Sequence, residues 1–367
     1  MSTVGSRVLW WGFALLAGGL SCSAVGQSSL VSSQTSNASQ AGSSAASVAV
    51  PDPAATLKSL RHSVDIGHTA DALKAIAEVR AQSGEMPGLR RIEGLARYAQ
   101  SELKLADTAF AAALKEDPND IESAQMRGLT LFRLGRPADA IPLLEFASSK
   151  GSLGKADPNY ILALCYMDTR RYDDARHAFA AQFGFAPDSA EAYLVAARML
   201  LRREYLPIAQ SFAEKSVELE PALPLAHELL GEIALAGNHL DEAVIQFEKE
   251  KAHNPLEGSI YDRLGDTYSR AARYDDAQRS LQEAILLEPN STGPYILLGK
   301  TMLKKGDPIA AMTYLNRAEQ MDPANYITHS LLGQAYRVMG RREDAARETE
   351  TAQKLQTASE PKIENVH

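Results

Sequence analysis

Histidine, cysteine and carboxylate side chains are the residues through which this chain could do chemistry, so their spacing decides whether a reactive or metal-binding site is predicted. The segment HELLGE (His227–Glu232) begins like the helix of a zinc protease, but Gly231 stands where the second histidine ligand must be. None of the eight histidines has a partner at the His-x-x-x-His spacing that places two ligands on one helix face. The eight are His62, His68, His177, His227, His239, His253, His329 and His367.

Other signatures of catalysis do not occur in the sequence. It has no glycine-rich phosphate loop, no nucleophile elbow, no paired-cysteine motif and no nucleophile set beside a base. We therefore predict neither an enzyme nor a bound cofactor or metal. Of the two cysteines, Cys165 falls inside a predicted helix as a small buried hydrophobe, whereas Cys22 belongs to the N-terminal segment.

The N-terminal segment 1–26 has the three-part layout of a secretory signal peptide. Arg7 is followed by the apolar run VLWWGFALLAGGL and by small residues that predict cleavage before Gln27. The run is too short for a comfortable transmembrane helix. Cys22 leaves a second interpretation open, a lipidated N-terminus, although Leu20 is one place closer to this cysteine than in a lipoprotein signal.

Residues 27–52 are predicted to be a disordered, flexible tether, because the stretch up to Val50 is uncharged and rich in Ser, Ala and Gln. After cleavage Cys165 is the only thiol, so no intramolecular disulfide can form. An exported chain without a disulfide favours a bacterial envelope. We therefore expect a periplasmic or extracellular protein, attached to a membrane only if Cys22 is lipidated.

The composition indicates helices that pack through small side chains. Apolar residues make up 45% of the 367 residues, but aromatic residues only 7%, and Ala and Leu predominate. The formal net charge of −8 argues against a nucleic-acid partner, which normally meets a basic surface.

Prolines mark an internal repeat, since they recur at one constant spacing along the chain, at Pro187, Pro221, Pro255, Pro289 and Pro323. With the proline as position 32 of each unit, nine units of equal length can be drawn, and Lys155 alone falls outside the register. The units are 53–86, 87–120, 121–154, 156–189, 190–223, 224–257, 258–291, 292–325 and 326–359, followed by a tail at 360–367.

Small residues recur at two positions of the unit. Position 20 is alanine in all nine units, and position 8 is glycine or alanine in units two to nine. Each unit also has two apolar stripes at helical spacing, separated by a polar turn. We expect two antiparallel helices, A and B, that approach closely where position 8 faces position 20, with proline ending helix B. One hairpin cannot bury its own apolar faces, so the hairpins must stack into a solenoid.

These columns resemble the tetratricopeptide repeat (TPR), which implies an all-α, right-handed superhelical solenoid of about nine units. Unit 258–291 carries the resemblance most fully, through Tyr261, Leu264, Gly265, Tyr268, Ala277, Leu281, Ala284 and Pro289. The first unit departs from the pattern with Leu60 at position 8 and Gly84 in place of proline. The ninth has Thr349 and Thr357 where a large apolar residue and proline are usual, as suits the exposed end of a stack.

Position 4 contains His227 and His329, whereas sister units have tyrosine at this position. We interpret both histidines as packing residues rather than metal ligands.

The resemblance also implies where a partner would bind, because the A helices of such proteins line a concave groove. Two interpretations of the charged residues there stay open: an ordinary solvated face, or a mixed-charge groove, more basic toward its C-terminal end, that binds an extended segment or helix of a partner. The pattern of Lys, Asn and Arg with which some TPR proteins clamp a terminal carboxylate is not reproduced. The candidate groove residues are Arg198, Arg202, Glu228, Glu232, Asp262, Arg263, Asp266, Arg270, Lys300, Lys304, Gln334 and Arg337.

The repeat leaves little room for another domain, so we expect a non-catalytic protein–protein interaction scaffold or adaptor in the bacterial envelope. Its partner would be another protein, and no cofactor or nucleic acid is expected. An alternative is a lipid-anchored assembly factor for pilus, secretion or outer-membrane machinery, which requires a lipidated Cys22.

Overall fold

The computed structural model describes residues 52–151 and 157–359. These two ranges contain 18 α-helices and no β-strand, which confirms the predicted all-α fold class. The predicted signal peptide, Cys22, the tether up to residue 51, Lys155 and the tail at 360–367 lie outside the described residues. None of the helices found is both long enough and apolar enough to cross a bilayer.

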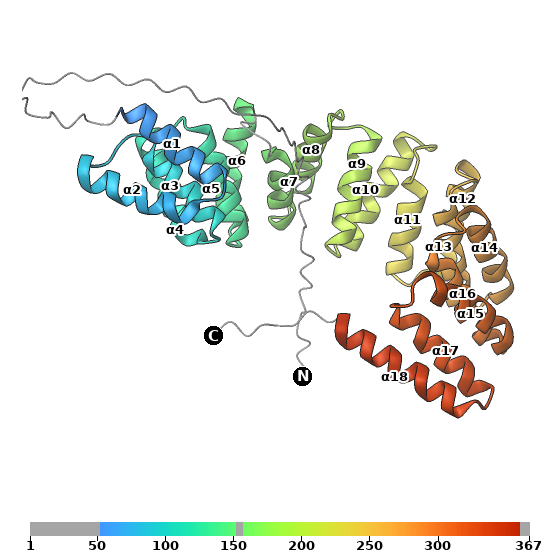
Figure 1. Cartoon of the computed structure of the whole chain (residues 1–367). Coiled ribbons are helices and arrows are strands. Elements are labelled where there is room, and N and C mark those ends of the chain that lie inside the picture. The colour runs from blue at the N-terminus through green and yellow to red at the C-terminus, as the bar shows by residue number, and fades with distance from the viewer. Residues whose placement is uncertain (1–51, 152–156, 360–367) are drawn as a thin grey trace, which may run out of the picture. The chain divides into compact units, whose positions relative to one another are not determined.

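The helices follow one another as nine antiparallel pairs in chain order (Figure 1). The A helices are α1 (Pro53–Asp65), α3 (Leu89–Ala99), α5 (Ile121–Arg133), α7 (Pro158–Asp168), α9 (Ala190–Arg202), α11 (Ala226–Ala236), α13 (Gly258–Arg270), α15 (Thr292–Lys305) and α17 (Tyr326–Val338). The B helices are α2 (Thr69–Ser83), α4 (Leu103–Glu116), α6 (Pro137–Lys150), α8 (Tyr172–Phe183), α10 (Leu206–Leu219), α12 (Leu240–His253), α14 (Tyr274–Leu287), α16 (Pro308–Met321) and α18 (Arg342–Ser359).

Several helices begin where the sequence supplies a cap. The side chain of Asp120 accepts a hydrogen bond from the backbone N–H of Ser123 at 3.2 Å, and Asp307 accepts one from Ala310 at 2.9 Å. Pro308 then occupies the first turn of α16, where its missing N–H is not needed for a helical hydrogen bond. The polar residues between the apolar stripes therefore determine where each of these helices starts.

One turn geometry joins helix A to helix B in every described unit. Position 15 always has a positive φ, which glycine adopts without strain and other residues adopt at a cost. The next residue donates its N–H back to the carbonyl five residues earlier, as Arg273 does to Tyr268 at 2.9 Å. The residues at this position are Gly67, Ser101, Gly135, Arg170, Glu204, Asn238, Ala272, Gly306 and Gly340.

Inside the hairpins, position 8 of helix A lies close to two positions of helix B. A Cβ atom placed on Gly265 would lie 2.4 Å from Cγ of Leu281, at position 24, and one on Gly94 would lie 2.5 Å from the ring of Phe110. Position 8 therefore packs against the side chain at position 24, and it also approaches the alanine at position 20, as expected. A Cβ atom on Gly128 would lie 3.5 Å from the carbonyl oxygen of Ala140, and one on Gly333 would lie 3.4 Å from that of Ala345. The side chain at position 24 is the nearer of the two, because Cα–Cβ bonds tilt toward the helix N-terminus and carry this side chain back over the turn that holds position 20.

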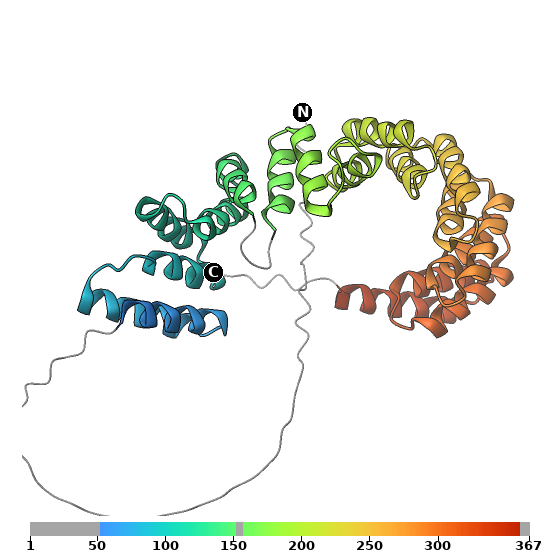
Figure 2. The ribbon, with the colours of Figure 1, turned by 90° about the horizontal axis from the view of Figure 1, so that it is seen from above.

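Consecutive hairpins pack through a B helix against the next A helix, and neighbouring A helices also touch each other in most of the array. Consecutive B helices in the described ranges have no comparable contact. The hairpins therefore approach one another most closely on the A side, which places the A helices on the inner face of the stack (Figure 2). The alanines at position 20 are buried in this packing; Ala277, for example, is 0% exposed.

The recurring proline at position 32 has a role beyond ending helix B. The hydroxyl of Tyr261, at position 4, donates a hydrogen bond to the carbonyl of Pro255 at 2.9 Å. Tyr295 contacts the carbonyl of Pro289 in the same way at 3.3 Å. The proline carbonyl is thus an acceptor for the next A helix, and the sequence signal for this bond was the tyrosine column at position 4.

The first and last hairpins and Cys165 have the burial that the sequence predicts. Leu60 is buried at position 8 of the first hairpin and packs with Ile76. In α18 only Ala345 and Ala352 are buried, so its outer face is polar. Cys165 is fully buried, and burial raises the pKa of its thiol to about 12, in agreement with its interpretation as a packing residue.

Candidate partner-binding face

The twelve predicted groove residues all lie on A helices, from α9 to α17. We call this surface the A face. Its central part, on α9, α11 and α13, contains four basic and four acidic candidates, whereas α15 and α17 contribute three basic candidates and Gln334. The A face therefore has two parts. We call α9, α11 and α13, with equal numbers of acidic and basic candidates, the balanced part, and α15 and α17 the basic part.

The balanced part is held by ion pairs between neighbouring A helices. A guanidinium nitrogen of Arg263 on α13 lies 2.7 Å from a carboxylate oxygen of Glu232 on α11. Arg198 on α9 approaches the other oxygen of Glu232 at 4.0 Å. Arg263 also lies 4.0 Å from Glu228, one turn earlier on α11. These charges neutralise one another across three hairpins and stabilise the face itself.

Two carboxylates in the balanced part are unusually protected from solvent. Burial raises the pKa of Glu228, and the nearby charge of Glu232 adds to the effect. Asp262 has a buried oxygen, Oδ1, without a hydrogen-bond partner. Burial raises the pKa of Asp262 to about 6, although the charge of Arg263 acts in the opposite direction. The ionised form of Asp262 is therefore disfavoured in the folded chain.

The remaining charged candidates of the balanced part stand farther from this network. Asp266 and Arg270 approach each other along α13, with 4.0 Å between the carboxylate and the guanidinium group. Arg202 lies at the last residue of α9 and is exposed. The structure thus brings together Arg198, Glu228, Glu232 and Arg263, but not all of the candidates.

The basic part has the opposite character. Helices α15 and α17 contain no acidic residue at all, and Lys304 and Arg337 are exposed. Between these helices is a hollow of about 300 Å³ lined by Lys300, Leu303, Lys304, Leu331, Gln334 and Val338. Leu331 is buried, whereas Val338 is 68% exposed. Basic and amide groups therefore surround an apolar surface, and the sequence had predicted only the polar members.

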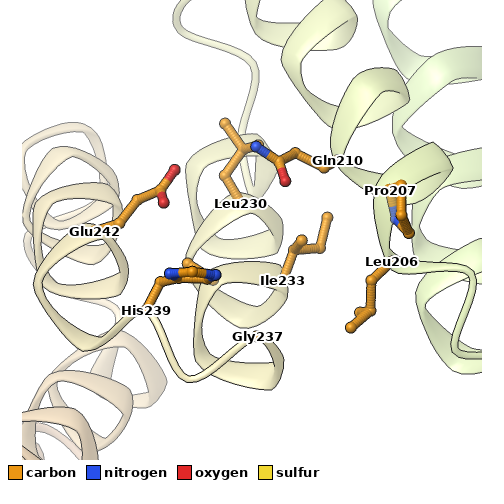
Figure 3. Close-up of a pocket in the computed structure, with 9 residues that line it drawn as sticks. Leu206, Pro207, Gln210, Leu230, Ile233, Gly237, His239 and Glu242 are labelled. Atoms are coloured by element: carbon orange, nitrogen blue, oxygen red, sulfur yellow. The ribbon is translucent and has the colours of Figure 1, made fainter.

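A second hollow, of about 240 Å³, lies between α10, α11 and α12. Figure 3 shows Leu206, Pro207 and Gln210 on one side, His239 and Glu242 on the other side, and Leu230 and Ile233 between them. Its walls are mainly apolar, and Gln210, His239 and Glu242 are exposed. This hollow contains none of the candidate groove residues.

Both position-4 histidines are buried, with 6% exposure each. His227 makes a hydrogen bond with Gln246 at 2.8 Å through Nδ1, and its ring stacks on that of His253. His329 contacts the carbonyl of Pro323 through Nε2 at 3.0 Å, as the tyrosines do in sister units.

Stacked helical hairpins with a charged inner face define a helical-repeat protein, and comparison with known proteins gives the family. A family model of the tetratricopeptide repeat matches residues 60–121, 126–183 and 263–326. The chain therefore belongs to the tetratricopeptide repeat family, whose members are generally non-catalytic interaction scaffolds, and this fold suits a role in protein interaction.

Comparison with individual proteins finds similarity at low sequence identity. Anaphase-promoting complex subunit cut9 of Schizosaccharomyces pombe is 25% identical over 181 residues, covering 43% of this chain and 27% of its own length. The chain thus matches about a quarter of that curated relative. The crystal structure of YrrB, described as a TPR protein with an unusual peptide-binding site, is 22% identical with a TM-score of 0.42, and covers 50% of this chain and 95% of YrrB. MamA from Desulfovibrio magneticus RS-1 is 20% identical with a TM-score of 0.45, and covers 47% of this chain and 98% of its own.

Proposed function

We propose that this chain is a protein-interaction scaffold that binds an acidic segment of a partner protein on the A face, in the hollow between α15 and α17. The segment would place one aliphatic side chain in the hollow and its carboxylates beside Lys300, Lys304 and Arg337. The observation that carries this proposal is the separation of the A face into a balanced part and a basic part.

The charge distribution favours α15 and α17 over the middle of the array. Around α11, a ligand would have to compete with the 2.7 Å pair between Arg263 and Glu232. On α15 and α17 no acidic residue competes within either helix, so basic groups there are available to carboxylates of a partner. Such groups speed the encounter and select the sign of the ligand more than they add affinity.

The apolar surface between α15 and α17 favours a ligand that also carries an aliphatic side chain. Leu303, Leu331 and Val338 contribute this surface, and the hollow of about 300 Å³ is large enough for a leucine or isoleucine side chain. Burial of such a side chain contributes roughly 1.5–3 kcal/mol. A short acidic segment with one aliphatic anchor therefore fits better than a uniformly acidic one.

We also propose that the chain is exported to the periplasm or the extracellular space, as the layout of its segment 1–26 suggests. The alternative, a lipid-anchored assembly factor, depends on Cys22. Mass spectrometry of the mature protein distinguishes the two, because one begins at Gln27 and the other at a lipidated Cys22.

The binding proposal is tested with a labelled 12-residue peptide of alternating Glu and Ser with one central Leu, measured by fluorescence anisotropy. The variant K300E/K304E/R337E should weaken binding about tenfold or more at low salt, as a loss of about 1.4 kcal/mol would produce. Its thermal unfolding midpoint should change little, since exposed charges contribute little to stability.

The matched control is K104E/K249E/R317E, which makes the same change of charge at exposed positions of the B helices α4, α12 and α16. This variant should bind the peptide nearly as the unmodified chain does. A peptide with Lys in place of Glu, or Ala in place of Leu, should bind more weakly. Equal binding by the two triple variants would contradict the proposed location.

A further inference from the structure

Three side chains with metal-ligating atoms converge at the last hairpin. Glu319 of α16, His329 of α17 and Glu348 of α18 each offer one ligand atom, and these atoms lie within 4.8 Å of one another. The side chain of His329 is only 8% exposed, and that of Glu348 is 22% exposed. The residues are ten and nineteen positions apart along the chain, so no short motif connects them.

The hydrogen bonds of His329 define which nitrogen carries a proton. Nε2 lies 3.0 Å from the carbonyl oxygen of Pro323, which can only accept, so Nε2 must be the donor. Nδ1 lies 2.7 Å from Oε2 of Glu348. In a neutral imidazole with its proton on Nε2, the lone pair of Nδ1 would face a carboxylate. A cation, either a proton or a metal ion, must therefore lie between these two atoms.

The net charge of the three side chains distinguishes a proton from a divalent metal ion at this place. An imidazolium ion neutralises only one of the two carboxylates. A neutral imidazole with two carboxylates has a charge of −2, which a divalent cation balances.

We propose that Glu319, His329 and Glu348 form a site for a divalent transition-metal ion of the zinc class, which joins α16, α17 and α18. Imidazole nitrogen and carboxylate oxygen are ligands that zinc accepts, whereas calcium and magnesium prefer oxygen alone. A ligating histidine usually donates its other N–H to a carbonyl or carboxylate, as His329 does to Pro323. Three protein ligands leave the fourth position to water.

Metal binding requires small adjustments of the carboxylate side chains, because the three ligand atoms now lie within 4.8 Å of one another. Zinc–ligand distances of about 2.0–2.2 Å in tetrahedral geometry place nitrogen and oxygen roughly 3.3 Å apart. The present separation between Nδ1 and Oε2 is 2.7 Å, so the partly exposed carboxylate of Glu348 must move outward by a little over half an ångström. Rotations within the flexible side chains of Glu348 and Glu319 would supply these movements.

The chain contains its own control at the same position of another unit. His227 also occupies position 4, but its Nδ1 contacts the amide oxygen of Gln246 at 2.8 Å. An amide oxygen is satisfied by the N–H of a neutral imidazole, so this site needs no added cation. The two histidines therefore have the same place in the fold and different expected ligands.

The test is zinc binding by the full chain, measured by isothermal titration calorimetry near neutral pH. We expect one site with a dissociation constant of about 10 µM or lower, a range typical of specific binding. H329Y should abolish this site and still fold, because tyrosine stands at position 4 in sister units. E319Q should weaken it at least tenfold, and H227Y should leave it unchanged. Cobalt should give a visible ligand-field absorption that H329Y abolishes.

Two results would overturn the proposal. Zinc binding that is equal in the unmodified chain and in H329Y would identify adventitious sites on exposed histidines and carboxylates. No binding at 100-fold excess zinc over about 10 µM protein, together with an NMR spectrum of a protonated His329 ring, would show that a proton alone bridges Nδ1 and Glu348. The variant E319Q also distinguishes a metal ion from a proton. It should weaken zinc binding, whereas a proton shared by His329 and Glu348 does not need Glu319.

Discussion

The contact between positions 8 and 24 can be tested by a double-mutant cycle in the seventh hairpin. G265A places a Cβ atom 2.4 Å from Cγ of Leu281, far inside van der Waals contact. Overpacking costs about 1–3 kcal/mol, and the better helix propensity of alanine returns up to about 1 kcal/mol. We therefore expect G265A to destabilise the hairpin by roughly 0–3 kcal/mol, and the bulkier G265L by more.

The second arm of the cycle removes the partner. Leu281 is fully buried, so L281A should cost about 2–5 kcal/mol through lost burial and a cavity. In the double variant, the new alanine occupies part of the space that Leu281 leaves. The chain already contains such a pair, Ala197 with Ala213, both 0% exposed. The destabilisation of G265A/L281A should therefore be smaller than the sum of the two single destabilisations, by about 1–3 kcal/mol.

Hydrogen exchange followed by mass spectrometry is the appropriate assay, because repeat arrays need not unfold in a single two-state step. The loss of protection should be greatest from α11 to α16, since coupling runs between neighbouring hairpins. G333A is a graded control: its Cβ would meet Oγ1 of Thr349 at 3.0 Å, so it should cost less. Additivity within about 0.5 kcal/mol in the cycle would refute direct contact between positions 8 and 24.

Three further predictions concern a turn, a carboxylate and a thiol. A272G should stabilise the seventh hairpin by about 1 kcal/mol, measured by urea unfolding, because Ala272 has a φ of 58° that glycine adopts without strain. Burial raises the pKa of Asp262 in the folded chain to about 6, from an ordinary value of 3.8. The folded chain therefore holds this proton more tightly than the unfolded chain, and the free energy of unfolding falls as pH rises through these values. D262N should therefore match the unmodified chain near pH 3.5 and exceed it by about 1–2 kcal/mol above pH 7, by thermal unfolding. In a C22S background, Cys165 should react with a thiol reagent only after unfolding, since it is buried and its pKa is raised to about 12.

The fold could be predicted from the sequence because the residue types that recur at fixed positions of the unit meet requirements of the backbone. Proline at a constant spacing fixes where each B helix ends, and apolar stripes fix which faces are buried. The common turn at position 15 could not be predicted from the sequence, because only four of the nine residues at this position are glycine. At the others, such as Arg170 and Glu204, the fold imposes a conformation that the residue type does not favour.

The candidate site could be predicted only in part, because ion pairs depend on how one helix is rotated relative to the next. The positions of Arg198, Glu232 and Arg263 on A helices were predictable, but not that their charges meet across three hairpins. The apolar residues Leu303 and Val338 could not be predicted, because an apolar side chain on an A helix gives the same sequence signal whether it packs inside the array or lines a groove. Glu319 and Glu348 were missed because they lie on B helices.

The two proposed sites share α17, so one can influence the other. His329 and Arg337 lie on this helix, eight residues apart, and a metal ion bound to His329 would fix α17 against α16 and α18. Zinc should then increase the affinity for the acidic peptide by restricting the motion of the helix that carries Gln334 and Arg337. By linkage, the peptide should increase zinc affinity by the same factor.

The variants separate this coupling from its alternatives. H329Y should remove the effect of zinc on peptide binding while leaving the metal-free affinity close to that of the unmodified chain. K300E/K304E/R337E should weaken peptide binding but leave zinc binding intact, because none of its three positions contributes a ligand. Peptide binding that is unaffected by zinc in the unmodified chain would mean that the last hairpin is already rigid, and that its metal ion does not communicate with the A face.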